Sequence, residues 1–93
     1  MKRHIYEYIM ELQGGTVDMP SGAKILSIQN QGMNGHVTVW AQVDVNQPEA
    51  PRRIKGYNTG GPFHDLYDAS EYLATVQFNE GSLIVHYFDE GEM

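Results

Sequence analysis

The stretch from residue 24 to residue 44 constrains the fold of this chain most strongly. Asn34-Gly35 within it is a strong hairpin signal, because a type I′ turn needs positive φ at both central residues. If these two residues form the loop, Leu26 lies opposite Val43 and one face of the hairpin is almost wholly apolar. A slip of one residue would mix apolar and polar side chains. Turn chemistry and hydrophobic pattern therefore predict the same register.

The other face of this hairpin is polar and bears Trp40, the chain's only tryptophan. In the predicted register Gln29 lies opposite Trp40, and Gln42 shares the face. Two interpretations stay open for the tryptophan. Either the segment around Phe63–Tyr67 or a second sheet covers it, or it anchors an interface, for which tryptophan is enriched. Gln29, Trp40 and Gln42 are therefore interface candidates.

Short apolar runs separated by turn residues predict the rest of the fold. The segment 4–12 reads as a strand on its aromatic and β-branched content, although Ile5, Tyr8, Ile9 and Leu12 also fit a helical stripe. Residues 63–71 are either one short helical turn or an irregular loop. We expect a mainly β fold, a small antiparallel sandwich or a partly open barrel of about five to seven strands. The expected strands outside the hairpin are His4–Leu12, Thr16–Met19, Arg52–Tyr57, Tyr72–Phe78 and Leu83–Phe88.

A chain of 93 residues is long enough for one domain with a modest core. We assign residues 1–88 to this domain. Asn46–Pro51 reads as a polar loop flanked by prolines, which cannot donate to a sheet ladder. The last five residues, DEGEM, read as an acidic flexible tail.

The composition excludes several kinds of chemistry. There is no cysteine, so disulfides, thiolate metal sites and a cysteine nucleophile are ruled out. The four histidines show no metal-ligand spacing such as HxH or HExxH, and no GxSxG elbow marks a catalytic serine. No apolar run approaches the roughly 20 residues that a membrane helix needs. We expect a non-enzymatic cytoplasmic protein without metal or cofactor.

The net charge of −6 is unevenly distributed. Through Lys55 there are six cations and five acids, net +1, whereas from Gly56 onward there are seven acids and no Lys or Arg, net −7. An acidic protein is a poor non-specific binder of nucleic acid. The acidic half serves solubility or meets a basic partner surface. Asp65, Asp68 and Glu71 are the interface candidates in this half.

Three of the six Lys and Arg residues, Arg52, Arg53 and Lys55, directly precede the glycine-rich loop 56–61. Guanidinium groups bind phosphates through paired hydrogen bonds, and consecutive N–H groups in a glycine turn can form an anion-binding hollow. The loop is neither a P-loop nor a Rossmann fingerprint. The alternatives are a solvated sheet edge that deters pairing, or contact with a partner protein. The candidate ligand or anion site comprises Arg52, Arg53, Lys55, Tyr57, Thr59, Gly60 and Gly61.

Taken together, these motifs resemble a group of small uncharacterised proteins encoded mainly by bacteriophages and prophages. The similarity spans nearly the whole chain, over Met19–Gln31, Trp40–Asp44, Arg52–Pro62, Tyr72–Gln77 and Leu83–Phe88. It implies a compact β-rich fold and a phage origin, and it implies no catalytic residue. By analogy with small acidic phage proteins, it implies a host-interaction or counter-defence factor.

Two functional hypotheses follow for the cytoplasm of a host cell. The first is a binding protein that inhibits a host defence protein or sequesters a nucleotide messenger. The second is a structural or assembly accessory protein that forms a homo-oligomer through the sheet face that carries Trp40.

Overall fold

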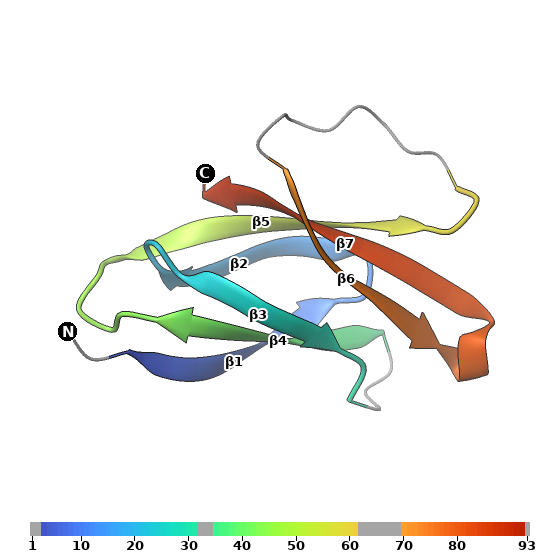
Figure 1. The fold of residues 1–93 in the computed structure, drawn as a ribbon, viewed down its shortest axis with the longest axis horizontal. Coiled ribbons are helices and arrows are strands. Elements are labelled where there is room, and N and C mark those ends of the chain that lie inside the picture. Colours follow the sequence, from blue (N-terminus) through green and yellow to red (C-terminus); the bar gives the residue numbers. More distant parts are fainter. Residues whose placement is uncertain (1–2, 32–34, 62–69, 93) are drawn as a thin grey trace.

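The computed structural model describes residues 3–31, 35–61 and 70–92. Within these ranges the chain forms seven strands and one short 3-10 turn, η1 (Asn79–Gly81). The strands make two antiparallel sheets that pack as a sandwich, with no closed barrel (Figure 1). This confirms the predicted fold class and decides between its two forms.

Sheet A has three strands in the order β1-β4-β3, and sheet B has four in the order β2-β5-β7-β6. The central strand of sheet A is therefore β4, and β5 and β7 are the inner strands of sheet B. The strand bounds are β1 His4–Glu11, β2 Gly14–Pro20, β3 Lys24–Gln29, β4 His36–Val43, β5 Glu49–Asn58, β6 Glu71–Phe78 and β7 Leu83–Glu92.

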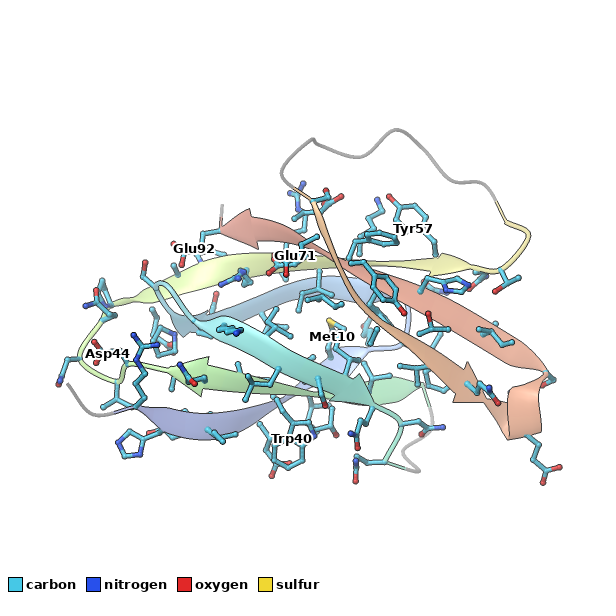
Figure 2. The ribbon with its side chains drawn as sticks, viewed as in Figure 1. Met10, Trp40, Asp44, Tyr57, Glu71 and Glu92 are labelled. Atoms are coloured by element: carbon cyan, nitrogen blue, oxygen red, sulfur yellow. The ribbon has the colours of Figure 1, made fainter. Side chains whose placement is uncertain are left out.

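The core lies between the inner faces of the two sheets. Alternate residues of β4 are buried there as the pattern predicts, from Val37 to Val43. Figure 2 shows Met10 between the sheets, with Trp40 and Tyr57 on the outer sides of sheets A and B. No helix in the described ranges is long and apolar enough to span a membrane.

Tyr87, on β7, is fully buried at the centre of this core. Its hydroxyl donates a hydrogen bond to the carbonyl of Leu12, at the turn between β1 and β2. Burial raises the pKa of Tyr87 to about 12. The ring passes close to Gly56 of β5, where an added Cβ would lie 3.1 Å from Tyr87 Cε1 and 2.9 Å from Val85 Cγ1. A residue without a side chain is therefore needed at position 56.

The predicted register of the β3–β4 hairpin is wrong by two residues. Gln29 pairs with Thr38 instead of Trp40, and Ser27 is the residue opposite Trp40. Because the shift in register is two residues and side chains alternate between faces, each β4 side chain stays on its predicted face of the sheet. A bulge between Ile25 and Ser27 then reverses the alternation, so that Ile25 is buried and Leu26 is 44% exposed. Asn34, in the predicted turn, lies outside the described residues.

Two further boundaries differ from the predicted ones. The helical alternative for residues 4–12 is wrong, because β1 pairs along its whole length with β4. The polar loop is shorter than predicted, since β5 begins at Glu49 and includes Pro51, which lies opposite Asp18. Pairing with β7 begins only at Arg52, so the missing N–H of Pro51 costs no ladder bond on that side.

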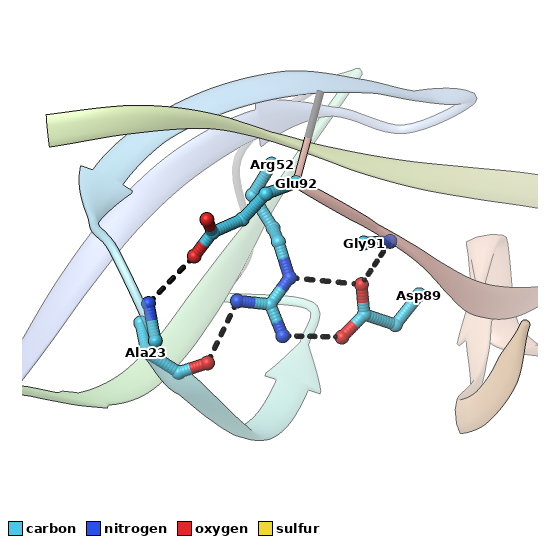
Figure 3. Close-up of polar contacts among 6 residues, drawn as sticks. Ala23, Arg52, Asp89, Gly91 and Glu92 are labelled. Carbon is cyan, nitrogen blue, oxygen red and sulfur yellow. Dashed lines mark hydrogen bonds and ion pairs between the residues drawn. The ribbon is translucent and has the colours of Figure 1, made fainter. Parts of the chain in front are cut away.

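The predicted flexible tail is also wrong for residues 89–92. They continue β7, and Asp89 is 8% exposed. Arg52 reaches it with two hydrogen bonds, Nε to Oδ1 at 2.9 Å and Nη2 to Oδ2 at 2.7 Å (Figure 3). Arg52 Nη1 also donates to the carbonyl of Ala23 at 2.7 Å, in the connection to β3. We call Arg52, Asp89 and Ala23 the clamp, because they tie sheet B to the start of β3.

Glu92 strengthens the same junction. It accepts hydrogen bonds from the N–H of Gly22 at 2.6 Å and from the hydroxyl of Ser21 at 3.0 Å. These two bonds, with the charge of Arg52, lower the pKa of Glu92. The final strand is thus held to the β2–β3 turn by charged groups, which physically explains why a polar sequence is ordered here.

Candidate ligand-binding face

Three aromatic rings from three strands meet on the outer side of sheet B. Tyr57 of β5 and Phe88 of β7 have ring centroids 5.9 Å apart at 75°, and Phe88 and Tyr72 of β6 have centroids 5.7 Å apart at 68°. Both contacts are edge-to-face, a favoured aromatic geometry. We call these three residues the aromatic row. Tyr72, at one end, is 55% exposed, whereas Tyr57, at the other, is buried.

The row is positioned by the strand pairing. Lys55 lies opposite Phe88, and Tyr57 lies opposite His86. Tyr72 also lies opposite Phe88, from the other side of β7. Because directly opposed residues share a face, these side chains occupy the same outer surface. Burial, and then the charge of Glu90, raise the pKa of Tyr57.

His86 sits beside the row with both ring nitrogens in hydrogen bonds. Nε2 lies 2.6 Å from the hydroxyl of Thr59, and Nδ1 lies 2.9 Å from the hydroxyl of Thr75. Thr75 in turn lies 2.7 Å from the hydroxyl of Tyr72. A hydroxyl either donates or accepts, so this chain satisfies either neutral tautomer of the imidazole. The chain fixes the histidine ring and couples it to the exposed end of the row.

Two cations of the predicted cluster lie on this face. Lys55 is exposed beside Phe88, and Arg53 is partly buried. Arg53 Nε is 4.0 Å from Glu90 Oε1, at the outer limit of an ion pair. The structure thus brings together Arg53, Lys55, Tyr57 and Thr59 of the predicted ligand site.

Arg52, by contrast, does not join them. Its side chain lies in the clamp, with a side-chain exposure of 13%, and the hydrogen bonds that it donates to Asp89 raise its pKa. The alternative of a solvated sheet edge is wrong for both arginines, because β5 lies between β2 and β7. Arg52 therefore holds the fold together at the opposite face of β5.

Two backbone N–H groups of the glycine-rich turn donate hydrogen bonds to carbonyl groups of the protein itself. The N–H of Thr59 donates to Ile84 O at 3.1 Å, and the N–H of Gly61 donates to Asn58 O at 3.1 Å. Gly60 has φ of 78°, which suits glycine. In this conformation the N–H groups of Thr59 and Gly61 are therefore not directed at an anion, as the predicted anion-binding hollow requires.

The interface candidates around Trp40 lie on the outer face of sheet A. Trp40 is partly buried, Gln29 is exposed, and Gln42 is partly buried on the same face. Sheet B packs on the other side of sheet A, so it does not cover the tryptophan. Glu71 is exposed at the start of β6. The structure does not describe the predicted candidates Asp65 and Asp68 or the segment Phe63–Tyr67. Of the range 63–71, for which a helical turn is the predicted alternative to a loop, only Ser70 and Glu71 are among the described residues.

Sequence reasoning missed most of the aromatic row and its histidine. The sequence pattern places Tyr72, His86 and Phe88 in two expected strands and gives none of them a binding role. A usable signal was the outward alternation of Ile84, His86 and Phe88 on an inner strand. Among the described residues no three His, Asp or Glu side chains gather in a way that could hold a metal ion.

The fold and this face define a small two-sheet β-sandwich with an aromatic, partly basic outer surface. The family model Domain of unknown function (DUF7352) matches residues 1–93, so the chain belongs to that family. No curated protein and no solved structure matches the chain.

Proposed function

We propose that this chain is a non-enzymatic binding protein that holds a nucleotide on the outer face of sheet B. One observation carries the proposal: the aromatic row ends in Tyr72, 55% exposed, and Lys55 stands opposite its central ring. A planar base and a phosphate are the two groups that such a surface accommodates together.

The energetics of this pairing are favourable. Stacking of one base on an aromatic side chain contributes about 1–3 kcal/mol. Lys55, and Arg53 beyond it, provide positive charge for a phosphate. Edge-to-face contacts hold Phe88 and Tyr72 in place, so little side-chain freedom is lost on binding.

His86 has a positioning role in this proposal. Both of its ring nitrogens contact threonine hydroxyls, Thr59 and Thr75, so the ring is held in one orientation. The imidazole therefore acts in this proposal as a fixed part of the floor beside the row.

The resemblance to phage-encoded proteins supplies a setting for the activity. In the cytoplasm of an infected cell, a small protein that sequesters a nucleotide messenger would act as a counter-defence factor. This is the form of the host-interaction hypothesis that we favour, because the aromatic row offers a ring-sized surface. Inhibition of a host defence protein through Glu71 and the neighbouring acids is the other form.

Isothermal titration calorimetry tests the proposal with cyclic dinucleotides and cyclic ADP-ribose isomers as probes. We expect saturable heat for at least one probe. Tyr72→Ala should weaken that binding about five- to hundredfold, from the loss of one stacking partner. Tyr72→Phe, which keeps the ring, should retain it, and Gln29→Ala on sheet A should leave it unchanged. No heat with any probe, or equal binding by Tyr72→Ala, would overturn the proposal.

A second candidate function is self-association through the outer face of sheet A. Two apolar side chains of β1 are exposed there, Ile5 at 64% and Ile9 at 50%, and Leu26, in the bulge of β3, is 44% exposed. Glu7 and Lys24 lie on this face on opposite edge strands. A two-fold axis along β4 would place β1 of one copy against β3 of the other, with Glu7 and Lys24 two residues apart along the strands.

Light scattering of the purified chain tests this second function. We expect a dimer that Trp40→Ala converts to a monomer, since tryptophan dominates interface energetics. Ile9→Glu should do the same, while Leu83→Ala, away from this face, should not. A wild-type monomer at high concentration would exclude it.

A further inference from the structure

A groove opens at the edge of the sandwich where β1 and β2 separate. It has a volume of about 340 Å³ and is lined by Tyr6, Tyr8, Pro20, Val45, Gln47 and Glu49. It lies away from both outer faces, because Tyr6 and Tyr8 pair with Ala41 and Val39 and so point to the inner side of sheet A.

The edge strands explain why the groove stays open. β1 is an edge strand of sheet A and β2 an edge strand of sheet B, and they are joined by a tight turn at one end only. Pro20, at the far end of β2, has no N–H with which to bridge them. Val45 is 42% exposed on the connection from β4 to β5, so the mouth is accessible.

The lining combines aromatic faces with one carboxylate. Tyr6 and Tyr8 are two residues apart on one strand, so their side chains leave the same face of β1 and line the groove together. Glu49 lies opposite Pro20 at the end of the β2–β5 pair. Glu49 lines the same groove as Tyr8, and burial, and then the charges of Glu49 and Tyr6, raise the pKa of Tyr8.

No described cation lines this groove. Arg3 lines a neighbouring hollow with Asp44, and Gln47 is the described residue that the two hollows share. His4 contacts Tyr6, with ring centroids 5.9 Å apart at 40°, so a nitrogen heterocycle already packs on one of these rings. Among the described residues no cation pairs with the Glu49 carboxylate, and aromatic rings beside a carboxylate form an arrangement that binds organic cations.

We propose that this groove is a binding site for the basic side chain, guanidinium or alkylammonium, of a partner protein, held between Tyr6 and Tyr8 and neutralised by Glu49. The groove is the size of a side chain, and Val45 and Pro20 fit its methylene stem. Glu49 supplies the complementary charge at the groove itself, and the net charge of the whole chain, −6, favours the approach of a basic partner from a distance. This site is independent of the nucleotide face on sheet B.

Nuclear magnetic resonance titration of the full chain at pH 8 tests the proposal. The probes are N-acetyl-arginine methylamide and N-acetyl-lysine methylamide, with N-acetyl-glutamine methylamide as a neutral control. We expect saturable shifts at Tyr6, Tyr8 and Glu49 for at least one basic probe and none for the neutral one. Glu49→Gln should weaken binding about three- to tenfold.

Matched variants keep the result interpretable. Glu49 is exposed, so its replacement by glutamine should leave the fold intact, and Asp18→Asn, an exposed acid on β2, should bind as wild type does. Tyr8→Phe should retain the site because the ring remains. Equal shifts with the neutral probe, no shifts with either basic probe, or unchanged affinity in Glu49→Gln would overturn the proposal.

Discussion

Arg52 of β5 and Asp89 of β7 form a bidentate ion pair, in which both hydrogen bonds are 2.9 Å or shorter. The side chains of Arg52 and Asp89 are 13% and 10% exposed. The third donor of Arg52 reaches Ala23, before β3. Residues from three distant parts of the sequence thus meet at one guanidinium. The sequence predicts that Arg52, Arg53 and Lys55 form one ligand site. In the fold, Arg52 belongs to the clamp, whereas Arg53 and Lys55 lie on the outer face of sheet B.

Replacement of Asp89 by alanine should destabilise the fold by about 2–4 kcal/mol, because it leaves a largely buried guanidinium without its carboxylate. Urea unfolding followed by tryptophan fluorescence measures the change. Asp18→Ala, an exposed acid on β2, should change stability by no more than about 0.5 kcal/mol. Equal stability of the two variants would contradict a structural role for the pair.

A chain that stops at Phe88 should be severely destabilised. It lacks Asp89 of the clamp and Glu92, which binds Gly22 and Ser21. A flexible tail would leave the unfolding midpoint unaltered on removal. Circular dichroism during thermal unfolding distinguishes the two, and an unchanged midpoint would contradict the assignment of residues 89–92 to β7.

The stability of the fold should fall as the pH rises from about 10 to about 12. Tyr87 titrates at 10.0 when unfolded and at about 12 in the fold. The neutral phenol is favoured in the folded state, so its contribution is complete below pH 10 and is lost through pH 12. The loss amounts to about 2–3 kcal/mol.

Comparison with Tyr87→Phe isolates this residue from the other tyrosines. The variant should be less stable by about 1 kcal/mol at pH 7, because the Leu12 carbonyl loses its donor. Urea unfolding at pH 8, 10 and 11 should show a shallower decline in the variant. Parallel curves would assign the alkaline loss to other groups.

Glu92 should contribute to stability above its ordinary pKa of 4.5 and lose that contribution in acid. Its folded pKa is lowered, so the carboxylate is the favoured form in the fold, and protonation removes the benefit as pH falls through the folded value. The difference in unfolding midpoint between wild type and Glu92→Gln should therefore shrink from pH 6 to pH 3. A constant difference would show that the carboxylate charge is not involved.

Gly56→Ala should destabilise the fold by about 1–3 kcal/mol, since the new methyl would press on Val85 and the ring of Tyr87. Gly15→Ala is the matched control, because nothing lies within 4 Å of its added Cβ. Differential scanning calorimetry of the two variants should give a lower midpoint only for Gly56→Ala. Similar midpoints would indicate that the core gives way at little cost.

Local patterns predicted the strands well, because alternation within one strand reflects its own two faces. The run from Val37 to Val43 is buried on the predicted side. The bulge at Ile25–Ser27 was not predictable in this way, since a single extra residue leaves no distinctive composition.

The candidate site depended on partners that are far apart in the sequence. Asp89 and Arg52 are 37 residues apart, so the end of the chain read as a polar tail. His86 finds Thr59 and Thr75 on either side only because β7 lies between β5 and β6. Strand order decides such contacts, and a hydrophobic pattern does not encode it.

The position of β7 also determines when the two halves of the sandwich can assemble. Sheet A draws all its strands from residues 4–43, so its ladders form from early parts of the chain. In sheet B, β6 has no strand to pair with until β7 is present. We expect folding to be slow and to be limited by the insertion of this central strand, as for other topologies rich in distant contacts. Until β7 is inserted, the apolar inner face of sheet A lacks its full cover, and the nascent protein depends on a strand made after all the others of the sandwich to protect it from aggregation.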